Sequence, residues 1–471
     1  MTRSDEVLPI DLLARQRVHV VGIGGAGMGA IASVLALMGH SVSGSDMKAS
    51  AGLERLRAQG VEVHVGHDAA QIGDVDAVAI STAVPVSNPE VRAARERGIP
   101  VLSRAEILAS IAAIRATVAV SGTHGKTTTS SMLALVLVEA GLQPSFIVGG
   151  ELNEIGSGAV WGTGEWFVVE ADESDGTFVE LGARIAVVTN IEADHLDYYS
   201  DLASIEKAFD RFIGDAPGPN LVCADDPGAG RLGQRHGALT YGTHPEADYR
   251  IVDPRTSRSG ASFTLVHDGV LGEVQLPVPG LHNIRNATAA IVAGMLVGAP
   301  FEAGRDAMLR YAGVARRFQY RGEVGGITVV DDYAHNPGKV KAVLEAAASG
   351  GWGRVVAVFQ PHRYSRTADL WRDFADAFVD ADVVVLTDVY GAGEAPRPGV
   401  TGMLLVHAVL DAHPRSRVVW LPKRADIVAF LAGELRPGDL CLTLGAGDVT
   451  SLPDELLAAL PTPAARPGGA S

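Results

Sequence analysis

Residues 119–129, Ala-Val-Ser-Gly-Thr-His-Gly-Lys-Thr-Thr-Thr, constrain the fold of this chain more than any other segment. They connect an apolar strand predicted over Ala116–Val120 to an apolar helix predicted over about Thr128–Glu139. Such a junction points free backbone N–H groups and the positive end of a helix dipole toward an anion. The segment therefore predicts an α/β sheet with a phosphate-binding loop at a strand end.

The residue types in this loop are those that a nucleoside triphosphate requires. Glycines let the backbone approach phosphate closely, Lys126 can reach the β and γ phosphates, and the Thr127 hydroxyl can bind Mg²⁺. The strict P-loop pattern has a glycine where this chain has Val120, so the segment is a shifted variant. We predict an ATP site made of Gly122, Thr123, His124, Gly125, Lys126, Thr127 and Thr128.

Length and charge limit the class of protein further. A chain of 471 residues suggests about three domains. The formal charge of −16 argues against general nucleic-acid binding, which needs a basic surface. The two cysteines lie far apart, no apolar stretch reaches the roughly 18 residues of a membrane span, and the N-terminus lacks a signal-peptide pattern. We expect a cytoplasmic protein without a membrane partner, either a monomer or a homodimer.

Apolar runs of strand length alternate with helical patterns along most of the chain, which predicts α/β domains with largely parallel sheets. Residues 243–280 differ, because their short alternating segments predict a small antiparallel patch. We predict three domains over residues 1–115, 116–317 and 318–471. The expected strands outside the patch are Arg17–Val21, His40–Gly44, Val61–Val65, Ala77–Ile80, Ile99–Leu102, Ala116–Val120, Trp166–Glu170, Ile185–Thr189, Ile327–Val330, Val355–Phe359, Val383–Thr387, Arg417–Leu421 and Leu440–Leu444.

A second glycine-rich turn follows the first predicted strand. Gly22-Ile-Gly24-Gly25-Ala-Gly27 fits the G-x-G-x-x-G pattern of dinucleotide folds, and Asp46 closes the next strand where a ribose-binding acid sits. The pattern describes a turn that offers a helix N-terminus to a diphosphate. NAD and the diphosphate of a UDP-sugar satisfy it equally, and a glycine-rich packing turn remains an alternative.

Two acidic segments follow predicted strands beyond the phosphate loop. The first runs Glu170-Ala-Asp172-Glu173-Ser-Asp175, and the second contains Glu192-Ala-Asp194-His195. Carboxylates beside a phosphate loop are the usual means of holding Mg²⁺ next to a transferring phosphoryl group. The alternative is a pair of solvated acidic loops, with His195 as an ordinary loop histidine.

Polar residues at other element ends suggest two further subsites. His282, Asn283 and Asn286 begin an apolar helix, where they serve either as caps or in adenine recognition. Arg363 and Arg366 follow a strand, and arginines there suit a bidentate grip on a carboxylate.

Taken together, the motifs resemble those of the Mur ligases of bacterial cell-wall synthesis. In chain order they are Gly-x-Gly-Gly-x-Gly-Met, Gly-Thr-His-Gly-Lys-Thr-Thr-Thr, Glu-Ala-Asp-Glu-Ser-Asp, Asn-Ile-Glu-Ala-Asp-His, His-Asn-x-x-Asn-Ala, Gln-Pro-His-Arg-Tyr-Ser-Arg-Thr and Tyr-Gly-Ala-Gly-Glu-Ala-Pro. The resemblance covers about residues 17–450. It implies a Rossmann-like N-terminal domain for a UDP-sugar, a central ATPase domain with a mixed sheet and a Rossmann-like C-terminal domain for an amino acid.

The resemblance also implies a reaction and its participants. ATP phosphorylates the lactyl carboxylate of UDP-N-acetylmuramate, and the amine of L-alanine attacks the acyl phosphate, as in peptidoglycan precursor synthesis. The family alternative is a recycling ligase that attaches an intact tripeptide to the same sugar. From another class, a dinucleotide-binding sensor accounts for Gly22–Gly27 but not for Lys126, Glu170 and His195 together.

Site residues follow from the same resemblance. Thr127, Glu170 and His195 are the implied Mg²⁺ ligands, and His282, Asn283 and Asn286 the adenine and ribose contacts. Lys126, His195, His335, Arg363 and Arg366 are the implied catalytic residues, with Tyr333 beside them on the substrate. The UDP-sugar contacts are expected at Gly22, Gly24, Gly25, Gly27, Met28, Asp46 and Ser81.

Two positions depart from the family pattern. Asn336 stands where a second histidine or a similar residue is expected, which weakens the role assigned to His335. Some sister ligases carry a carbamylated lysine about fifteen positions after the residue equivalent to His195, but this chain has Asp210 there. We therefore expect no carbamate.

Overall fold

The computed structural model of the chain describes residues 10–81, 83–174, 176–194, 198–257, 260–311, 313–314, 316–348 and 350–460. These residues gather into two compact units. The first comprises Met1–Arg255, Ala261–Pro277 and Leu281–Ala312, and the second comprises Thr256–Gly260, Val278–Gly280 and Gly313–Ser471. The described residues form three sheets, two in the first unit and one in the second.

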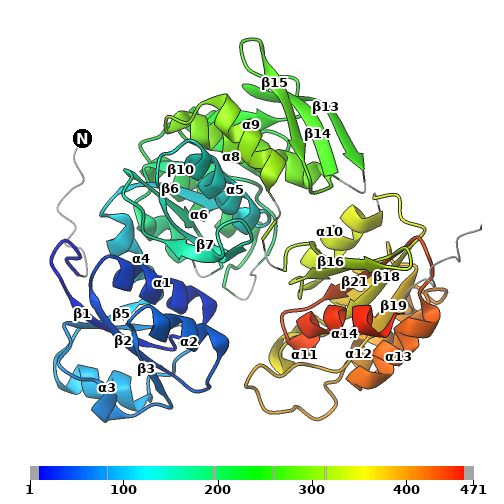
Figure 1. Ribbon diagram of the computed structural model, residues 1–471, viewed down its shortest axis with the longest axis horizontal. Coiled ribbons are helices and arrows are strands. Elements are labelled where there is room, and N and C mark those ends of the chain that lie inside the picture. The colour runs from blue at the N-terminus through cyan, green and yellow to red at the C-terminus, as the bar shows by residue number, and fades with distance from the viewer. Residues whose placement is uncertain are drawn as a thin grey trace, which may run out of the picture. The chain divides into compact units, whose positions relative to one another are not determined.

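The first sheet has five parallel strands in the order β3-β2-β1-β4-β5 (Figure 1). Its strands are β1 Arg17–Val21, β2 Ser41–Asp46, β3 Glu62–Val65, β4 Ala77–Ile80 and β5 Val101–Ser103, and its helices are α1 Ala26–Leu37, α2 Ala51–Ala58, α3 Pro89–Glu96 and α4 Arg104–Ala112, with the 3-10 turn η1 Ala69–Gln71. The strand order reverses between β1 and β4, so the glycine-rich turn after β1 lies at a switch point, where ligands bind in doubly wound sheets.

The second sheet has ten strands in the order β15-β14-β13-β12-β11-β10-β6-β9-β7-β8. Its strands are β6 Ala116–Ser121, β7 Ser145–Leu152, β8 Ser157–Val160, β9 Trp166–Glu170, β10 Ile185–Val188, β11 Leu221–Cys223, β12 Leu239–Gly242, β13 Tyr249–Ser257, β14 Gly260–Val266 and β15 Val270–Leu276. Its helices are α5 Lys126–Glu139, α6 Leu202–Asp215, α7 Pro227–His236, α8 Leu281–Leu296 and α9 Phe301–Arg310, with the 3-10 turn η2 Thr177–Leu181. The sheet is parallel around β6 and antiparallel where β7 meets β8 and β14 meets β15.

Helix α5 is enclosed by its neighbours. Every residue from Thr129 to Leu137 is buried, and the helix packs against α8 and α9. A buried helix is fixed in position, so the loop that precedes it is held rigidly at the end of β6.

The third sheet has six strands in the order β16-β17-β21-β18-β19-β20, with β16 antiparallel to β17 and the other pairs parallel. Its strands are β16 Gln319–Val324, β17 Ile327–Asp332, β18 Arg354–Phe359, β19 Val383–Leu386, β20 Val418–Trp420 and β21 Asp439–Leu444. Its helices are α10 Pro337–Ala348, α11 Tyr364–Leu370, α12 Met403–Ala412, α13 Arg424–Glu434 and α14 Leu452–Ala459, with the 3-10 turns η3 Asp373–Asp376 and η4 Asp448–Ser451.

Apolar cores cover both faces of this third sheet. Along β18, Val355 and Phe359 pack into one core and Val356 and Val358 into the other, as the alternation of side chains along a strand requires. The carboxyl ends of β17, β21, β18 and β19 meet at one edge, because these strands are parallel neighbours. The loops at that edge carry the polar residues of this unit.

The predicted α/β fold with a mixed central sheet is confirmed, and most strands lie within two residues of their predicted bounds. Helix α5 begins at Lys126 rather than near Thr128, because Gly125 takes a left-handed conformation and starts the helix directly after it. The domain boundaries near 115 and 317 stay predictions. In the described ranges, no helix combines the length and apolar character needed to cross a bilayer.

Candidate active site

The loop between β6 and α5 is shaped by two glycines. Gly122 and Gly125 have φ angles of 135° and 82°. A Cβ atom at Gly122 would lie 2.1 Å from Thr189 Oγ1, and one at Gly125 would lie 2.5 Å from Asn286 Oδ1. Glycine is therefore required at both positions, for backbone conformation and for space.

The end of β10 holds this loop in place. The backbone N–H of His124 donates to Asn190 Oδ1 at 2.8 Å, and Asn190 Nδ2 donates to the His124 carbonyl at 3.0 Å. Thr189 Oγ1 donates to the same carbonyl at 2.6 Å. Sequence reasoning missed these two anchors, although their place at a strand end, directly before the second acidic segment, was a signal.

Lys126 is enclosed between the loop and the first acidic segment. Its Nζ donates to the Gly122 carbonyl at 2.8 Å and lies 2.7 Å from Glu173 Oε2. Burial alone would lower the pKa of Lys126, but the carboxylates of Glu173, Asp172 and Glu170 outweigh it and raise the pKa. Lys126 is therefore protonated at neutral pH, and its charge is held in one position. Glu173 is a site residue that the predicted set did not include.

Two of the three predicted metal ligands lie side by side. Thr127 Oγ1 donates to Glu170 Oε1 at 2.8 Å, and Glu170 Oε2 accepts from the Gly149 N–H at 2.6 Å. A hydroxyl and a carboxylate are the hard oxygen ligands that Mg²⁺ prefers, so these residues fit that ion. His195, the third, lies outside the described residues. Within the described ranges, no three His, Cys, Asp or Glu side chains are close enough to hold a metal.

The start of α8 lies against the phosphate loop. Asn286 Oδ1 accepts from Thr129 Oγ1 at 3.2 Å, and Asn286 and Asn283 are both buried, whereas His282 is exposed. Arg285 on the same turn pairs with Asp225 at 2.7 Å. Asn286 thus lies beside Gly125, and its role in the nucleotide site stays a prediction.

The N-terminal glycine-rich turn is tied to the end of β2. The N–H groups of Gly22 and Ile23 donate to the Ser45 carbonyl at 2.8 and 3.1 Å. The Gly24 N–H donates to Asp46 Oδ2 at 2.9 Å, and a Cβ atom at Gly24 would lie 2.8 Å from the Asp46 carboxyl carbon. Asp46 therefore orders the turn itself, in addition to the ribose contact predicted for it.

Other predicted contacts of the turn divide into two groups. Ser81 lies beside it, since a Cβ atom at Gly22 would come within 3.3 Å of Ser81 Cβ. The Met28 side chain, in the first turn of α1, is buried in the apolar core, and the substrate contact expected at Met28 stays a prediction. Arg104, which sequence reasoning missed, has its Nε 3.0 Å from a Cβ atom placed at Gly27, and that buried Nε has no hydrogen-bond partner among the residues that the structure describes.

In the second unit, the loops after β17, β18 and β19 bring aromatic and basic side chains together. The ring centroids of Tyr333 and His335 lie 5.1 Å apart, those of His335 and His362 lie 5.8 Å apart, and His362 stacks on Tyr390 at 5.9 Å. Arg366 Nη1 lies 3.1 Å from His362 Nδ1. The predicted residues Tyr333, His335 and Arg366 thus form one cluster, which His362 and Tyr390 complete.

The hydrogen bonds of this cluster fix its protonation. His335 Nδ1 lies 2.9 Å from the Tyr333 carbonyl, which only accepts, so this nitrogen carries the proton and Nε2 is an acceptor. Burial, followed by the charge of Arg366, lowers the pKa of His335 to about 3 and that of His362 to about 4. Both rings are therefore neutral at pH 7.

Arg363 and Asn336 frame this cluster. Arg363 is exposed, has a φ angle of 69°, and its N–H donates to the Tyr390 carbonyl at 2.8 Å. Asn336 Oδ1 accepts from the Lys339 N–H at 2.9 Å at the start of α10. The residue that departs from the expected pattern thus acts as a helix cap.

The other position that departs from the family pattern lies in the first unit. Asp210 pairs there with Arg235 and His236, at 2.7 and 2.9 Å.

Three family models match consecutive parts of the chain. They are the Mur ligase family catalytic domain over residues 17–115, the Mur ligase middle domain over 120–294 and the Mur ligase glutamate ligase domain over 316–447. Among curated proteins, the UDP-N-acetylmuramate–L-alanine ligase of Acidothermus cellulolyticus is 50% identical over 97% of both chains. The protein of the same name from Pelotomaculum thermopropionicum is 47% identical over 94% of this chain and 97% of its own.

Solved structures agree. A crystal structure of the UDP-N-acetylmuramate–alanine ligase of Thermotoga maritima superposes with a TM-score of 0.80 at 28% identity, over 94% of this chain and 99% of its own. A murein peptide ligase from Psychrobacter arcticus superposes with a TM-score of 0.70 at 24% identity, over 94% and 98%, which shows a shared fold.

Proposed function

The chain belongs to the Mur ligase family, and we propose that it is the member that joins L-alanine to the lactyl carboxylate of UDP-N-acetylmuramate in peptidoglycan precursor synthesis, with hydrolysis of ATP to ADP and phosphate. The observation that carries this proposal is the match at 47–50% identity, over nearly the whole chain, to relatives named for that reaction. The tripeptide-recycling alternative has less support, because the murein peptide ligase is the more distant structural match.

The first step transfers a phosphoryl group between two anions. An oxygen of the lactyl carboxylate attacks the γ phosphorus of ATP, ADP leaves, and a carboxylic–phosphoric anhydride forms. Lys126 supplies a fixed positive charge for the oxygens that gain charge during this transfer. The backbone N–H groups of the loop after Gly122 hold the phosphates, and Glu173 accepts from the Lys126 Nζ at 2.8 Å and so restricts where this cation lies.

Thr127 and Glu170 would hold a Mg²⁺ ion, which neutralises phosphate charge when bound. The two oxygens lie at hydrogen-bond distance from each other, so both would be available to the ion at one place. Gly149 fixes the second oxygen of Glu170 and thus the direction in which the carboxylate faces.

The second step needs a neutral amine. The amine nitrogen of L-alanine attacks the acyl carbon, inorganic phosphate leaves, and one proton is released from the nitrogen. His335 is neutral with Nε2 as an acceptor, so it can accept a hydrogen bond from the amine, but its pKa of about 3 makes it too weak a base to keep the proton, which leaves with the phosphate. Arg363 and Arg366 present planar donors for the α-carboxylate of the amino acid.

Release of phosphate with different acceptors tests this assignment. Wild-type enzyme is incubated with ATP and UDP-N-acetylmuramate plus L-alanine, glycine, L-serine or the tripeptide, each at the same concentration. We expect L-alanine to give the highest kcat/KM and the tripeptide to give none above the background without acceptor. A higher kcat/KM for the tripeptide would establish the recycling ligase instead.

A further inference from the structure

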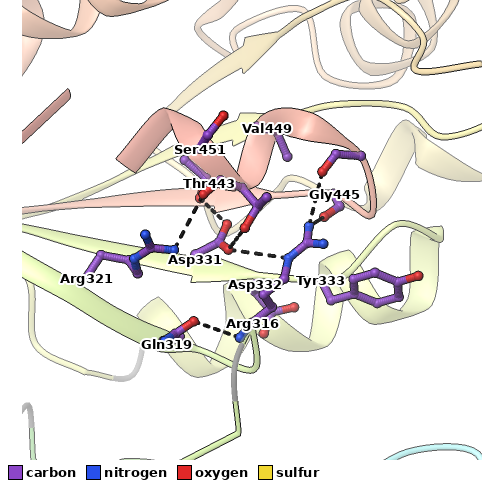
Figure 2. A network of polar contacts seen from close by, with 12 residues as sticks. Arg316, Gln319, Arg321, Asp331, Asp332, Tyr333, Thr443, Gly445, Val449 and Ser451 are labelled. Atoms are coloured by element: carbon purple, nitrogen blue, oxygen red, sulfur yellow. Dashed lines mark hydrogen bonds and ion pairs between the residues drawn. The ribbon is translucent and has the colours of Figure 1, made fainter. Parts of the chain in front are cut away.

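We propose that Arg316 is a positioning residue of the amino-acid site, which acts by fixing the ring of Tyr333 and the loop that carries Tyr333 and His335. This inference rests on the proposed function, since it assumes that this loop receives L-alanine. Arg316 is not among the residues that the sequence motifs assign to any substrate. Figure 2 shows its side chain between Asp331, Gly445 and Tyr333.

The backbone of Arg316 is already joined to the loop. The Tyr333 N–H donates to the Arg316 carbonyl at 2.9 Å, and the Arg316 N–H donates to Gln319 Oε1 at 2.9 Å. Arg316 has a φ angle of 61°, a left-handed conformation that is uncommon for a residue with a side chain. The side chain of Arg316 makes several specific contacts, and these offset the free-energy cost of the left-handed backbone.

The guanidinium of Arg316 connects two strand-end loops. Its Nη2 donates to the Gly445 carbonyl at 2.5 Å and to the Gly447 carbonyl at 3.4 Å, in the loop that follows β21. Its Cζ lies 5.0 Å from the centre of the Tyr333 ring, in the loop that follows β17. A planar cation over an aromatic face restricts where the ring can lie, so Arg316 ties the position of Tyr333 to the β21 loop.

Asp331 holds this guanidinium in turn. The Asp331 side chain is fully buried, and its Oδ2 lies 3.5 Å from Arg316 Nε. Its two oxygens also accept from Thr443 Oγ1 at 2.6 Å and from Thr450 Oγ1 at 2.7 Å (Figure 2). A buried carboxylate fixed by two hydroxyls is a rigid counter-charge, so the side chain of Arg316 has a preferred direction before any ligand binds.

A residue with a purely structural role could form the same ion pair. The test must therefore measure substrate binding, through KM, and not stability alone. In Arg316→Ala we expect KM for L-alanine to rise about tenfold, with KM for ATP and for UDP-N-acetylmuramate within about twofold of wild type. Arg316→Lys keeps the charge without the planar fork and should recover only part of the loss. Arg321→Ala is the matched control, because Arg321 lies on β16, which follows Arg316 in the chain, and pairs with Asp454 at 2.7 Å. The KM of the Arg321→Ala enzyme for L-alanine should not change.

A double-mutant comparison decides whether Arg316 acts through Tyr333. In a Tyr333→Ala background, Arg316→Ala should raise KM for L-alanine less than twofold further. Equal increases in both backgrounds would overturn the proposal, as would an unchanged KM in Arg316→Ala. Should Arg316→Ala fail to fold, Asp331→Asn, which keeps one oxygen to accept from a threonine hydroxyl and removes the counter-charge, must raise KM for L-alanine about threefold, and an unchanged KM would overturn the proposal equally.

Failure of the proposed function looks different from failure of this inference. If wild-type enzyme released no phosphate with L-alanine, the assignment of the reaction itself would fall. If the wild type is active and only the Arg316 effects are absent, the reaction stands and the positioning role falls.

Discussion

At the scale of single residues, each of the two units holds polar side chains in place before substrates arrive. Lys126 is fixed between a carbonyl and Glu173, and neutral His335 is fixed by the Tyr333 carbonyl. In both cases the partner restricts the side chain and thereby reduces the reorganisation that the reaction requires. Sequence motifs indicated Lys126, Tyr333 and His335, but they did not indicate that Glu173, which follows another strand, holds Lys126.

Lys126→Ala tests the role of the positive charge on Lys126. Loss of the fixed cation should lower kcat for phosphate release by about 10²–10³-fold, while binding of UDP-N-acetylmuramate, measured by calorimetry, stays near wild type. Lys207→Ala, an exposed lysine on α6, is the control and should keep full activity. Near-normal turnover in Lys126→Ala would contradict the assignment of this loop as the phosphate-binding loop.

Arg363 and Arg366 test the predicted amino-acid site of the second unit. Loss of one bidentate contact to the α-carboxylate should reduce kcat/KM for L-alanine by roughly 10–150-fold, and a lysine at position 363 should restore only part. KM for ATP should stay within about twofold of wild type. Unchanged kcat/KM for L-alanine in both Arg363→Ala and Arg366→Ala would place the amino-acid site elsewhere.

At the scale of elements, strand ends determine which residues meet. The sequence indicated the strands themselves well, because buried parallel strands are continuous apolar runs such as Ile185–Val188. It could not indicate that β21 inserts between β17 and β18, since no local pattern encodes the neighbour of a strand. Contacts such as that of Asn190 with the phosphate loop, 66 residues away along the chain, depend on such pairings and were missed for that reason.

A buried polar cluster links three elements of the first sheet. Glu90 at the start of α3 is fully buried and accepts from Ser45 Oγ on β2 at 2.6 Å. His67 Nδ1 lies 2.9 Å from it, and His19 Nε2 on β1 lies 3.6 Å from it. Burial alone would raise the pKa of Glu90, but the nearby His19 ring and the hydrogen bonds from Ser45 and His67 together lower it.

This cluster predicts a pH-dependent stability. Because the pKa of Glu90 is lower in the folded state than in the unfolded chain, its stabilisation is complete above about pH 4.5 and is lost as pH falls through the folded value. Glu90→Gln should lower the thermal midpoint by about 2–4 °C at pH 7, and the difference from wild type should shrink toward pH 4. Glu96→Gln, an exposed acid on the same helix, is the control. A difference that stays constant between pH 7 and pH 4 would contradict this explanation.

At the scale of the whole molecule, we expect the reaction to divide among three sheets. The first carries a diphosphate-type turn, the second the phosphate loop with Glu170, and the third the cluster of Tyr333, His335 and Arg366. The order of motifs along the chain was enough to indicate this division and the family. It was not enough to give the partners Glu173 and His362, because those follow from how the loops fold.

The transfer of oxygen from substrate to phosphate tests the central claim most directly. UDP-N-acetylmuramate labelled with ¹⁸O in its lactyl carboxylate is incubated with the enzyme, ATP and L-alanine, and the products are examined by mass spectrometry. If the carboxylate is phosphorylated before the amine attacks, each released phosphate carries one oxygen from the carboxylate, and the sugar product gains one alanine residue. Phosphate without ¹⁸O, formed together with the alanine adduct, would contradict the acyl phosphate. Phosphate released without any adduct would contradict the ligase activity itself.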